Sequence, residues 1–87
     1  VGQLRCKATG RKVTVLSSQP AAVLYTGNWL AGGCPKTKSD KYYQDYAGVA
    51  IECQGFSDAV NHPDFPSIYL KADELYCNKI VFKLEQF

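Results

Sequence analysis

The sequence contains no methionine, one tryptophan and one histidine, and it has no long apolar run. A membrane-spanning helix needs about 20 consecutive apolar residues, so no membrane association is predicted. Repeats, low-complexity stretches and internal linkers are also absent. With 46% hydrophobic and 21% charged residues, the composition is that of a folded protein. The 87 residues therefore predict one small domain, residues 1–87, with a small core.

A strong net charge is also missing. The formal charge is +2, which is too small to indicate a nucleic-acid binder. Two local basic clusters stand out: Arg5, Lys7, Arg11 and Lys12 near the start, and Lys36, Lys38 and Lys41 in the middle. Surface lysines are common on strand edges and loops, so a solvated surface is one interpretation. The alternative is a basic face that binds phosphates or an acidic partner.

Closely spaced metal ligands are missing too. Zinc sites usually take ligands in near pairs, whereas here the cysteines lie far apart and His62 has none beside it. We therefore predict no metal and no other cofactor. An even, dispersed set of cysteines in a short chain is typical of two disulfides in a secreted domain. The set is Cys6, Cys34, Cys53 and Cys77. A first residue Val1 and the lack of methionine fit a processed, extracellular protein without its signal peptide.

The amino-terminal region alternates apolar and polar residues. Residues 3–8 and 12–16 predict two strands that form a hairpin across Thr9-Gly10. Next, Ser17-Ser18-Gln19-Pro20 is typical of a helix start, because serine caps free N–H groups and proline suits the first turn. We expect a helix over residues 18–31 that ends at Gly32-Gly33.

Later segments predict strands. Residues 42–53 are rich in aromatic and β-branched residues, while residues 67–71 and 79–84 alternate apolar with polar positions. One helix followed by several antiparallel strands predicts an α+β fold, in which a single α-helix packs on an antiparallel β-sheet.

Four short motifs in this order resemble a known family. They are Leu4-Arg5-Cys6, the segment Lys41-Tyr42-Tyr43-Gln44-Asp45-Tyr46-Ala47-Gly48, the segment Asp64-Phe65-Pro66-Ser67-Ile68, and Asn78-Lys79-Ile80-Val81-Phe82. Together with the predicted helix, they make the chain resemble the small fungal guanyl-specific ribonucleases. The chain also resembles the RNase-like effectors that powdery mildews secrete into plant cells. The resemblance implies a microbial ribonuclease-like fold.

The resemblance also implies a disulfide pairing, because the related effectors join their amino-terminal strand to the far end of the chain. It pairs Cys6 with Cys77 and leaves Cys34 to Cys53. The pairing of Cys6 with Cys53 and of Cys34 with Cys77 stays open as the alternative.

The resemblance further implies that catalysis is lost. Cleavage of RNA needs a base, an acid and a cation at the phosphate. Where the ribonucleases have glutamate and arginine, this chain has Asp64 and Lys79, and their first histidine falls on Asp40 or Ser39. The chain ends at Phe87 before an equivalent of their second histidine. We therefore expect a pseudo-ribonuclease that does not cleave RNA.

The predicted function is that of a non-catalytic effector from a plant-pathogenic fungus. As a monomer, secreted and delivered into host cells, it would bind a host protein, with RNA as a second partner, and be recognised by a plant immune receptor. The candidate binding surface consists of Tyr42, Tyr43, Tyr46, Asp64, Lys79, Lys36, Lys38 and Lys41. Two alternatives stay open. One is a weakly active endoribonuclease built on Asp64, Lys79 and His62; the other is a small disulfide-rich toxin or inhibitor of unrelated fold.

Overall fold

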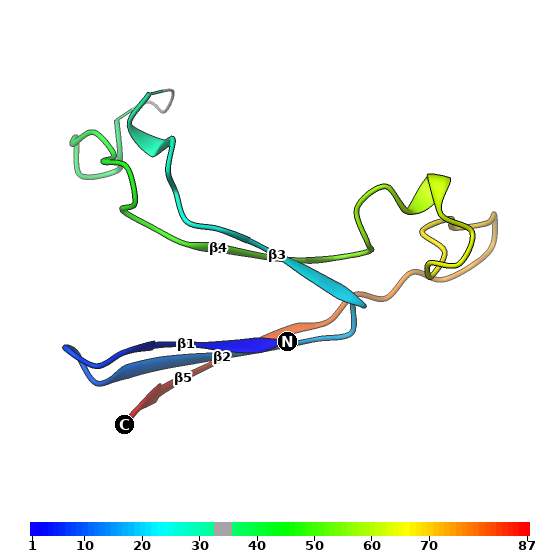
Figure 1. The fold of residues 1–87 in the computed structure, drawn as a ribbon, viewed down its shortest axis with the longest axis horizontal. Coiled ribbons are helices and arrows are strands. Elements are labelled where there is room, and N and C mark those ends of the chain that lie inside the picture. The colour runs from blue at the N-terminus through cyan, green and yellow to red at the C-terminus, as the bar shows by residue number, and fades with distance from the viewer. Residues whose placement is uncertain (33–35) are drawn as a thin grey trace. The chain divides into compact units, whose positions relative to one another are not determined.

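The computed structural model describes residues 1–32 and 36–87, and these residues form an all-β structure. Its strands and two 3₁₀ turns are, in chain order, β1 (Gly2–Cys6), β2 (Arg11–Ser17), β3 (Ala21–Tyr25), η1 (Leu30–Gly32), β4 (Ala50–Gln54), η2 (Ala59–Asn61) and β5 (Ile80–Gln86). One sheet has the order β1-β2-β5, and β3 pairs with β4 in another (Figure 1). The chain divides into two compact units, Val1–Ala22 with Cys53–Phe87, and Val23–Glu52.

The three-stranded sheet begins with a hairpin. β1 and β2 are antiparallel, with Gly2 opposite Val15 and Cys6 opposite Arg11, and Gly10 adopts a positive φ of 64° in the turn between them. β5 pairs antiparallel with the other edge of β2, so both termini of the chain lie at this sheet (Figure 1). The hairpin and the last strand are therefore confirmed.

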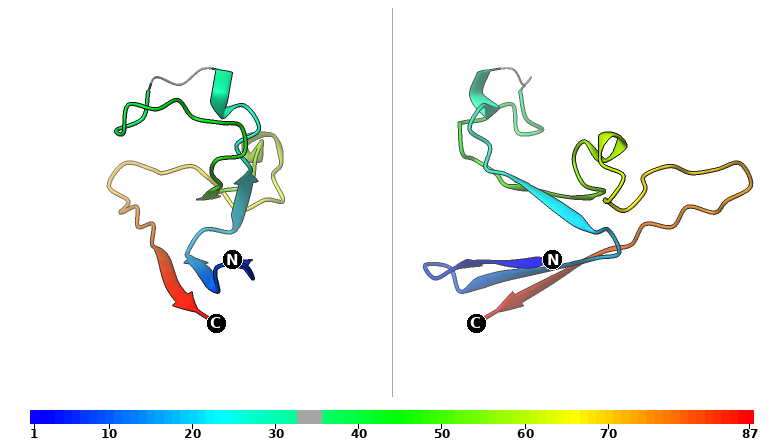
Figure 2. Two further views of the ribbon diagram at one scale, coloured as in Figure 1. Left: turned by 90° about the vertical axis from the view of Figure 1, so that its left-hand side faces the viewer. Right: turned by 45° about the vertical axis from the view of Figure 1, so that its right-hand side comes forward.

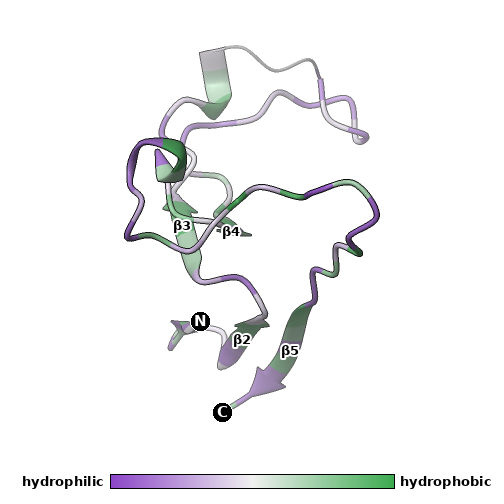
Figure 3. Ribbon diagram, turned by 90° about the vertical axis from the view of Figure 1, so that its right-hand side faces the viewer, coloured by the Kyte–Doolittle hydropathy of each residue, from purple (hydrophilic) through white to green (hydrophobic). Residues whose placement is uncertain are grey.

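The register gives this sheet one apolar face. Directly paired residues point to the same side of a sheet, so the rows Leu4–Val13–Leu84 and Gly2–Val15–Phe82 share a face. Figure 3 shows β5 green over its first part and purple towards its end. Val15, on the central strand, is 1% exposed, whereas Leu84 is 79% exposed. The core of this unit is therefore narrow and lies on β2.

The predicted helix over residues 18–31 is wrong. Residues 21–25 form β3, and Gly27 has φ 76°, which a right-handed helix does not allow. The Ser17 hydroxyl does accept a hydrogen bond from a backbone N–H, that of Gln19 at 3.0 Å, but it does so in a bend between two strands. The α+β fold is therefore corrected to an all-β one. No helix of the described residues is long and apolar enough to cross a membrane.

Two predicted strands are also wrong or shortened. A strand was predicted over residues 42–53, but the observed strand β4 begins only at Ala50 and ends at Gln54. Tyr46 has φ 61°, which interrupts extended backbone. Residues 67–71 form no strand. Figure 2 shows the yellow and orange segment between η2 and β5 running out and back without a neighbouring strand to pair with.

The predicted disulfides are wrong as well. Cys6, Cys53 and Cys77 are free, and Cys34 lies outside the described residues. Cys6 lies at the Arg11 end of β2, whereas Cys77 precedes Ile80, which pairs with Ser17 at the other end.

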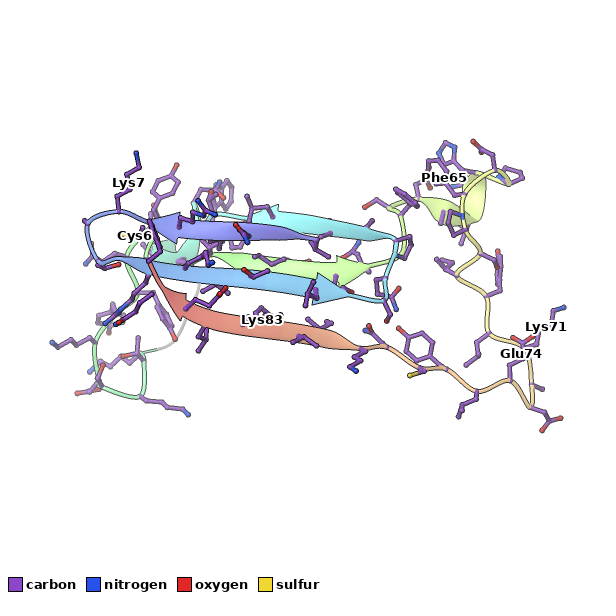
Figure 4. The ribbon with its side chains drawn as sticks, turned by 90° about the horizontal axis from the view of Figure 1, so that it is seen from below. Cys6, Lys7, Phe65, Lys71, Glu74 and Lys83 are labelled. Carbon is purple, nitrogen blue, oxygen red and sulfur yellow. The ribbon has the colours of Figure 1, made fainter. Side chains whose placement is uncertain are left out.

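Figure 4 shows Cys6 at one end of the sheet and the segment with Lys71 and Glu74 beyond the opposite end. A strand of this length spans roughly 20 Å, while a disulfide needs Cα atoms within about 7 Å.

Truncation of the buried valine should destabilise the unit that contains this sheet. Val15→Ala removes two methyl groups from the most enclosed apolar side chain, and we expect a loss of about 1–3 kcal/mol in the free energy of unfolding. Val60→Ala, at a position that is 53% exposed, is the matched control and should cost less than about 0.5 kcal/mol. Urea denaturation measures both; equal losses would contradict the position of the core.

The Cys6 thiol should be unusually reactive. Hydrogen bonds from the side chain and backbone of Thr9 hold the pKa of this exposed thiol below its ordinary value, and the charge of Arg11 adds to the effect. We expect iodoacetamide at pH 7 to alkylate Cys6 before the buried Cys53, without prior reduction. Thr9→Val should slow the reaction at Cys6 several-fold, as read by mass spectrometry. Protection of Cys6 until a reductant is added would instead indicate a disulfide.

Candidate functional site

Part of the predicted binding surface lies on the loop between η1 and β4. The Lys36 Nζ atom lies 3.1 Å from an Asp40 carboxylate oxygen and 5.7 Å from the centre of the Tyr42 ring. The Thr37 N–H donates to the Lys41 carbonyl at 2.7 Å and closes this loop. Tyr42, Tyr43 and Tyr46 are all exposed, and so are Lys38 and Lys41. The structure thus brings Lys36 and Tyr42 together.

The other two residues of that surface belong to the other compact unit. Asp64 is exposed in the turn after η2. Lys79 is fixed through its backbone, because its N–H donates to the Ser18 hydroxyl at 2.9 Å and its carbonyl accepts from the Ser18 N–H at 3.0 Å. Among the described residues, no hydrogen bond or ion pair joins Asp64 to Lys79. The paired charges expected at the phosphate site are therefore not assembled.

Most acidic side chains already have partners. The engaged ones are Asp40 with Lys36, Asp45 with the Ala31 N–H, Asp58 with Asn61 and His62, Glu74 with the Lys71 N–H, and Glu85 with Lys12 and Thr14. Within residues 1–32 and 36–87, this leaves the side chains of Glu52, Asp64 and Asp73. Asp64 and Asp73 lie in turns, whereas Glu52 lies on β4.

The strand fixes the direction of the Glu52 side chain. Successive residues of a strand point to opposite faces, so Glu52 shares a face with Ala50 and Gln54 and points away from the face of Ile51 and Cys53. Cys53 is buried and anchors the strand, while Glu52 is exposed. A carboxylate on a fixed strand, without an ion pair to occupy it, is suited to accept a proton from a ligand.

A second proton-transfer group is the Asp58–His62 pair. The His62 Nε2 atom lies 3.2 Å from Asp58 Oδ2, and the ring stacks on Phe65 with 4.7 Å between centroids. Phe65 in turn contacts Phe56 at 5.0 Å. A carboxylate that holds one ring nitrogen leaves the other free to exchange a proton. The pair is half-exposed, since the side chain of His62 is 46% accessible and that of Asp58 is 59% accessible.

The polar face of the three-stranded sheet is occupied by a different network. Gln3 donates to the Thr14 hydroxyl at 3.1 Å, and that hydroxyl donates to Glu85 at 3.1 Å. Lys12 Nζ lies 3.2 Å from the same Glu85 carboxylate. The hydrogen bond from Lys12, followed by that from Thr14, holds the pKa of Glu85 below its ordinary value of 4.5. These groups satisfy one another, so they are structural.

No sequence pattern singles out Glu52, and His62 was predicted without its partner Asp58. Glu52 lies inside residues 42–53, which predict a strand from their aromatic and β-branched residues, and a single charge there carries no signal of its own. A signal for the pair existed, because Asp58 and His62 are four positions apart, the spacing that places both on one side of a helical turn.

Comparison with known proteins identifies the relatives of this chain. The family model described as aldose 1-epimerase matches residues 1–83. The galactose mutarotase of Rattus norvegicus is 42% identical over 87% of this chain and 22% of its own length, and that of Homo sapiens is 40% identical over the same shares. The aldose 1-epimerase of Escherichia coli is 32% identical over 84% of this chain and 25% of its own. No solved structure matches. The chain thus spans about a fifth of the length of the curated relatives that it matches.

These matches overturn the resemblance to ribonucleases. The family match covers nearly the whole chain, whereas the resemblance depended on motifs of three to eight residues that occur in many strands. The effector function, the pseudo-ribonuclease and the toxin or inhibitor alternative are wrong with it, since the relatives are named as epimerases and mutarotases. Secretion and a monomeric state stay predictions.

Acid should weaken the polar face of the sheet. Because the pKa of Glu85 is lower in the folded chain than in the unfolded one, its contribution to stability is full above about pH 5 and is lost as the pH falls through that lowered pKa. We expect Glu85→Gln to reduce the fall in the urea midpoint between about pH 5 and pH 3. Lys12→Met should reduce it too, because Lys12 is the main cause. An unchanged pH dependence in both variants would contradict the network.

Proposed function

Because the chain belongs to the aldose 1-epimerase family, we propose that it takes part in the interconversion of the two anomers of an aldose. The family match over residues 1–83 is the observation that carries this proposal. Galactose is the first substrate to test, since several relatives are named galactose mutarotases.

The chemistry requires one proton to leave and another to arrive. A base removes the proton of the hydroxyl on C1, an acid protonates the ring oxygen, and the bond between C1 and the ring oxygen breaks to give the open-chain aldehyde. Rotation of the aldehyde group and closure of the ring then produce the other anomer. No oxidant, reductant or metal is consumed, and positioned acid and base groups typically accelerate such proton transfers 10²–10⁴-fold, about 3–5 kcal/mol of the barrier.

Glu52 is the residue that we assign to the base. Its carboxylate is fixed by β4, is exposed to a ligand, and has no ion pair among the described residues, so it can accept a proton without first losing a partner. The Asp58–His62 pair is the second group suited to proton transfer, because Asp58 orients the imidazole. Each group is tested separately.

The activity is measured by polarimetry. The purified chain is added to freshly dissolved α-D-galactose, and the approach of the optical rotation to equilibrium is compared with the spontaneous rate at the same pH. We expect an acceleration proportional to protein concentration. A rate equal to the spontaneous one at high protein concentration would contradict the proposed activity of this chain.

The roles of the residues are separated by matched variants. Glu52→Gln keeps the size of the side chain and removes the base, so the catalysed rate should fall about 10²–10⁴-fold. Glu74→Gln, an acidic side chain in an exposed loop, should leave the rate unchanged. His62→Gln should lower the rate only if the imidazole transfers a proton. Full activity of Glu52→Gln would remove Glu52 as the base and leave the activity itself in place.

A further inference from the structure

β5 leaves one edge of the three-stranded sheet open. It pairs with β2 alone, and no strand of residues 1–32 and 36–87 lies on its other side. Figure 4 shows Lys83 on this strand. An open edge carries backbone N–H and C=O groups that can pair with a further strand. No proline interrupts the seven residues of β5 and its register with β2 is continuous, so the edge is open over its full length.

Two hydrogen bonds at the ends of the β2–β5 ladder show which backbone groups face the open edge. The Phe87 N–H donates to the Gly10 carbonyl at 2.9 Å. At the other end, the Ser18 N–H donates to the Lys79 carbonyl at 3.0 Å. Along an antiparallel ladder, residue pairs that exchange hydrogen bonds alternate with pairs that do not. The odd-numbered residues of β5 therefore bond to β2, and the even-numbered ones direct their N–H and C=O groups to the open edge, namely Ile80, Phe82, Leu84 and Gln86.

The charges of β5 are complementary to those of a second copy of the same strand. Lys83 has no ion pair among the described residues, and Glu85 follows it on the same, polar face of the sheet. An antiparallel pairing of two β5 strands centred on Leu84 places Lys83 of each copy directly opposite Glu85 of the other. Opposite charges in directly opposed positions stabilise a ladder, whereas like charges there destabilise it. The charges of β5 therefore favour pairing of the strand with itself.

The same register uses the backbone groups that face the open edge. With Leu84 opposite its own copy, Phe82 lies opposite Gln86, and these residues are all even-numbered. Each such pair can exchange both of its backbone hydrogen bonds. Lys83 and Glu85 then form a pair without hydrogen bonds, the kind in which the opposed side chains lie closer together. Backbone geometry and charge thus select the same register.

The apolar face of the sheet gains from this pairing as well. Leu84 is 79% exposed and Phe82 is 56% exposed, because β5 has a neighbouring strand on one side only. Directly opposed residues point to the same side of a sheet, so Leu84 would lie beside Leu84 of the second copy. The pairing therefore removes apolar surface of the most exposed core-facing side chain from water.

β1, the other edge of the sheet, does not offer the same fit. It contains Arg5 but no acidic residue, so two copies of β1 would bring no opposite charges together. Pairing of β1 with β5 of another copy would be heterologous, and such a contact adds copies in an open series unless its rotation closes a ring. The open edge of β5 is therefore the one suited to a closed dimer.

We propose that β5 is a dimerisation edge, through which two copies of this chain pair antiparallel over residues 82–86. Leu84 lies at the two-fold axis, and Lys83 of each copy forms an ion pair with Glu85 of the other. The dimer replaces the monomer expected from the sequence. It does not rest on the proposed epimerase activity, because neither Glu52 nor His62 lies on β5.

Sedimentation equilibrium of the parent chain measures the self-association. A contact through one short strand is small, so we expect a dimer with a dissociation constant on the order of 10–100 μM. A chain that stays monomeric at about 500 μM would overturn the proposal. Growth into species larger than a dimer would overturn it too, because pairing about a two-fold axis uses up the open edge of both β5 strands.

Two charge variants test the register. Lys83→Glu and Glu85→Lys each place like charges opposite one another, and either should weaken the dimer about tenfold or more. An equimolar mixture of the two variants restores opposite charges at both positions and should form a heterodimer. Lys71→Glu, the same change of charge in an exposed turn before β5, is the matched control and should dimerise as the parent does. Equal weakening by Lys71→Glu, or a mixture no tighter than its components, would contradict the register.

A proline variant tests the backbone pairing without a change of charge. Because the Leu84 N–H faces the open edge, Leu84→Pro removes no hydrogen bond of the β2–β5 ladder, and an unchanged circular dichroism spectrum would show that the variant is folded. It removes donors at the centre of the dimer and should leave the chain monomeric at about 500 μM. Leu84→Ala keeps the N–H and should still dimerise. Association of Leu84→Pro as tight as that of the parent would refute pairing through β5.

Discussion

The structure depends on one antiparallel ladder, that between β2 and β5. It pairs residues 11–17 with residues 80–86, and the ladder is continued by two hydrogen bonds between Ser18 and Lys79. Everything from residue 19 to residue 78 is a connection closed by this ladder. The entropy of closing so long a loop is recovered by a ladder of seven residue pairs and by the burial of Val15 between two neighbouring strands. Without β5, the central strand would have one partner and an open edge.

The parts of the fold that the sequence predicted correctly are those whose pattern is local. Much of the hairpin and the second half of the last strand alternate apolar with polar residues, and the glycine at position 10 marks the turn. The prediction of a helix over residues 18–31 was wrong because an apolar segment of this length is compatible with a helix and, equally, with a strand followed by a loop. A serine and a proline before the run serve either structure, and Ser17 makes the same kind of hydrogen bond in a bend that it would make at a cap. The positive φ of Gly27 decides between them, and a single glycine within such a run permits that conformation without requiring it.

The candidate site was harder to predict than the fold, and the reasons are physical. Among residues 1–32 and 36–87, Glu52 is the strand carboxylate that has no ion pair, and such partners become visible only when distant segments are placed in space. The cysteines misled for a related reason. An even number in a short chain indicates disulfides, yet Cys6 and Cys77 lie at opposite ends of the sheet because β5 runs antiparallel to β2. The direction of β5 therefore separates Cys6 from Cys77, and the number of cysteines in the chain cannot reveal this.

The β2–β5 ladder also determines how long β2 waits for its second partner strand during synthesis. The β1–β2 hairpin can form as soon as its residues leave the ribosome, but Lys79, the first partner of the far edge, follows Ser18 by 61 residues. At a synthesis rate of about 5–20 residues per second, β2 has an unpaired edge and an uncovered Val15 for roughly 3–12 s. During that interval the nascent hairpin presents a row of free N–H and C=O groups beside an apolar face, which is the condition under which strands pair with the wrong chain. Arg11 and Lys12 lie on that temporary edge strand, and their positive charges oppose its pairing with another chain.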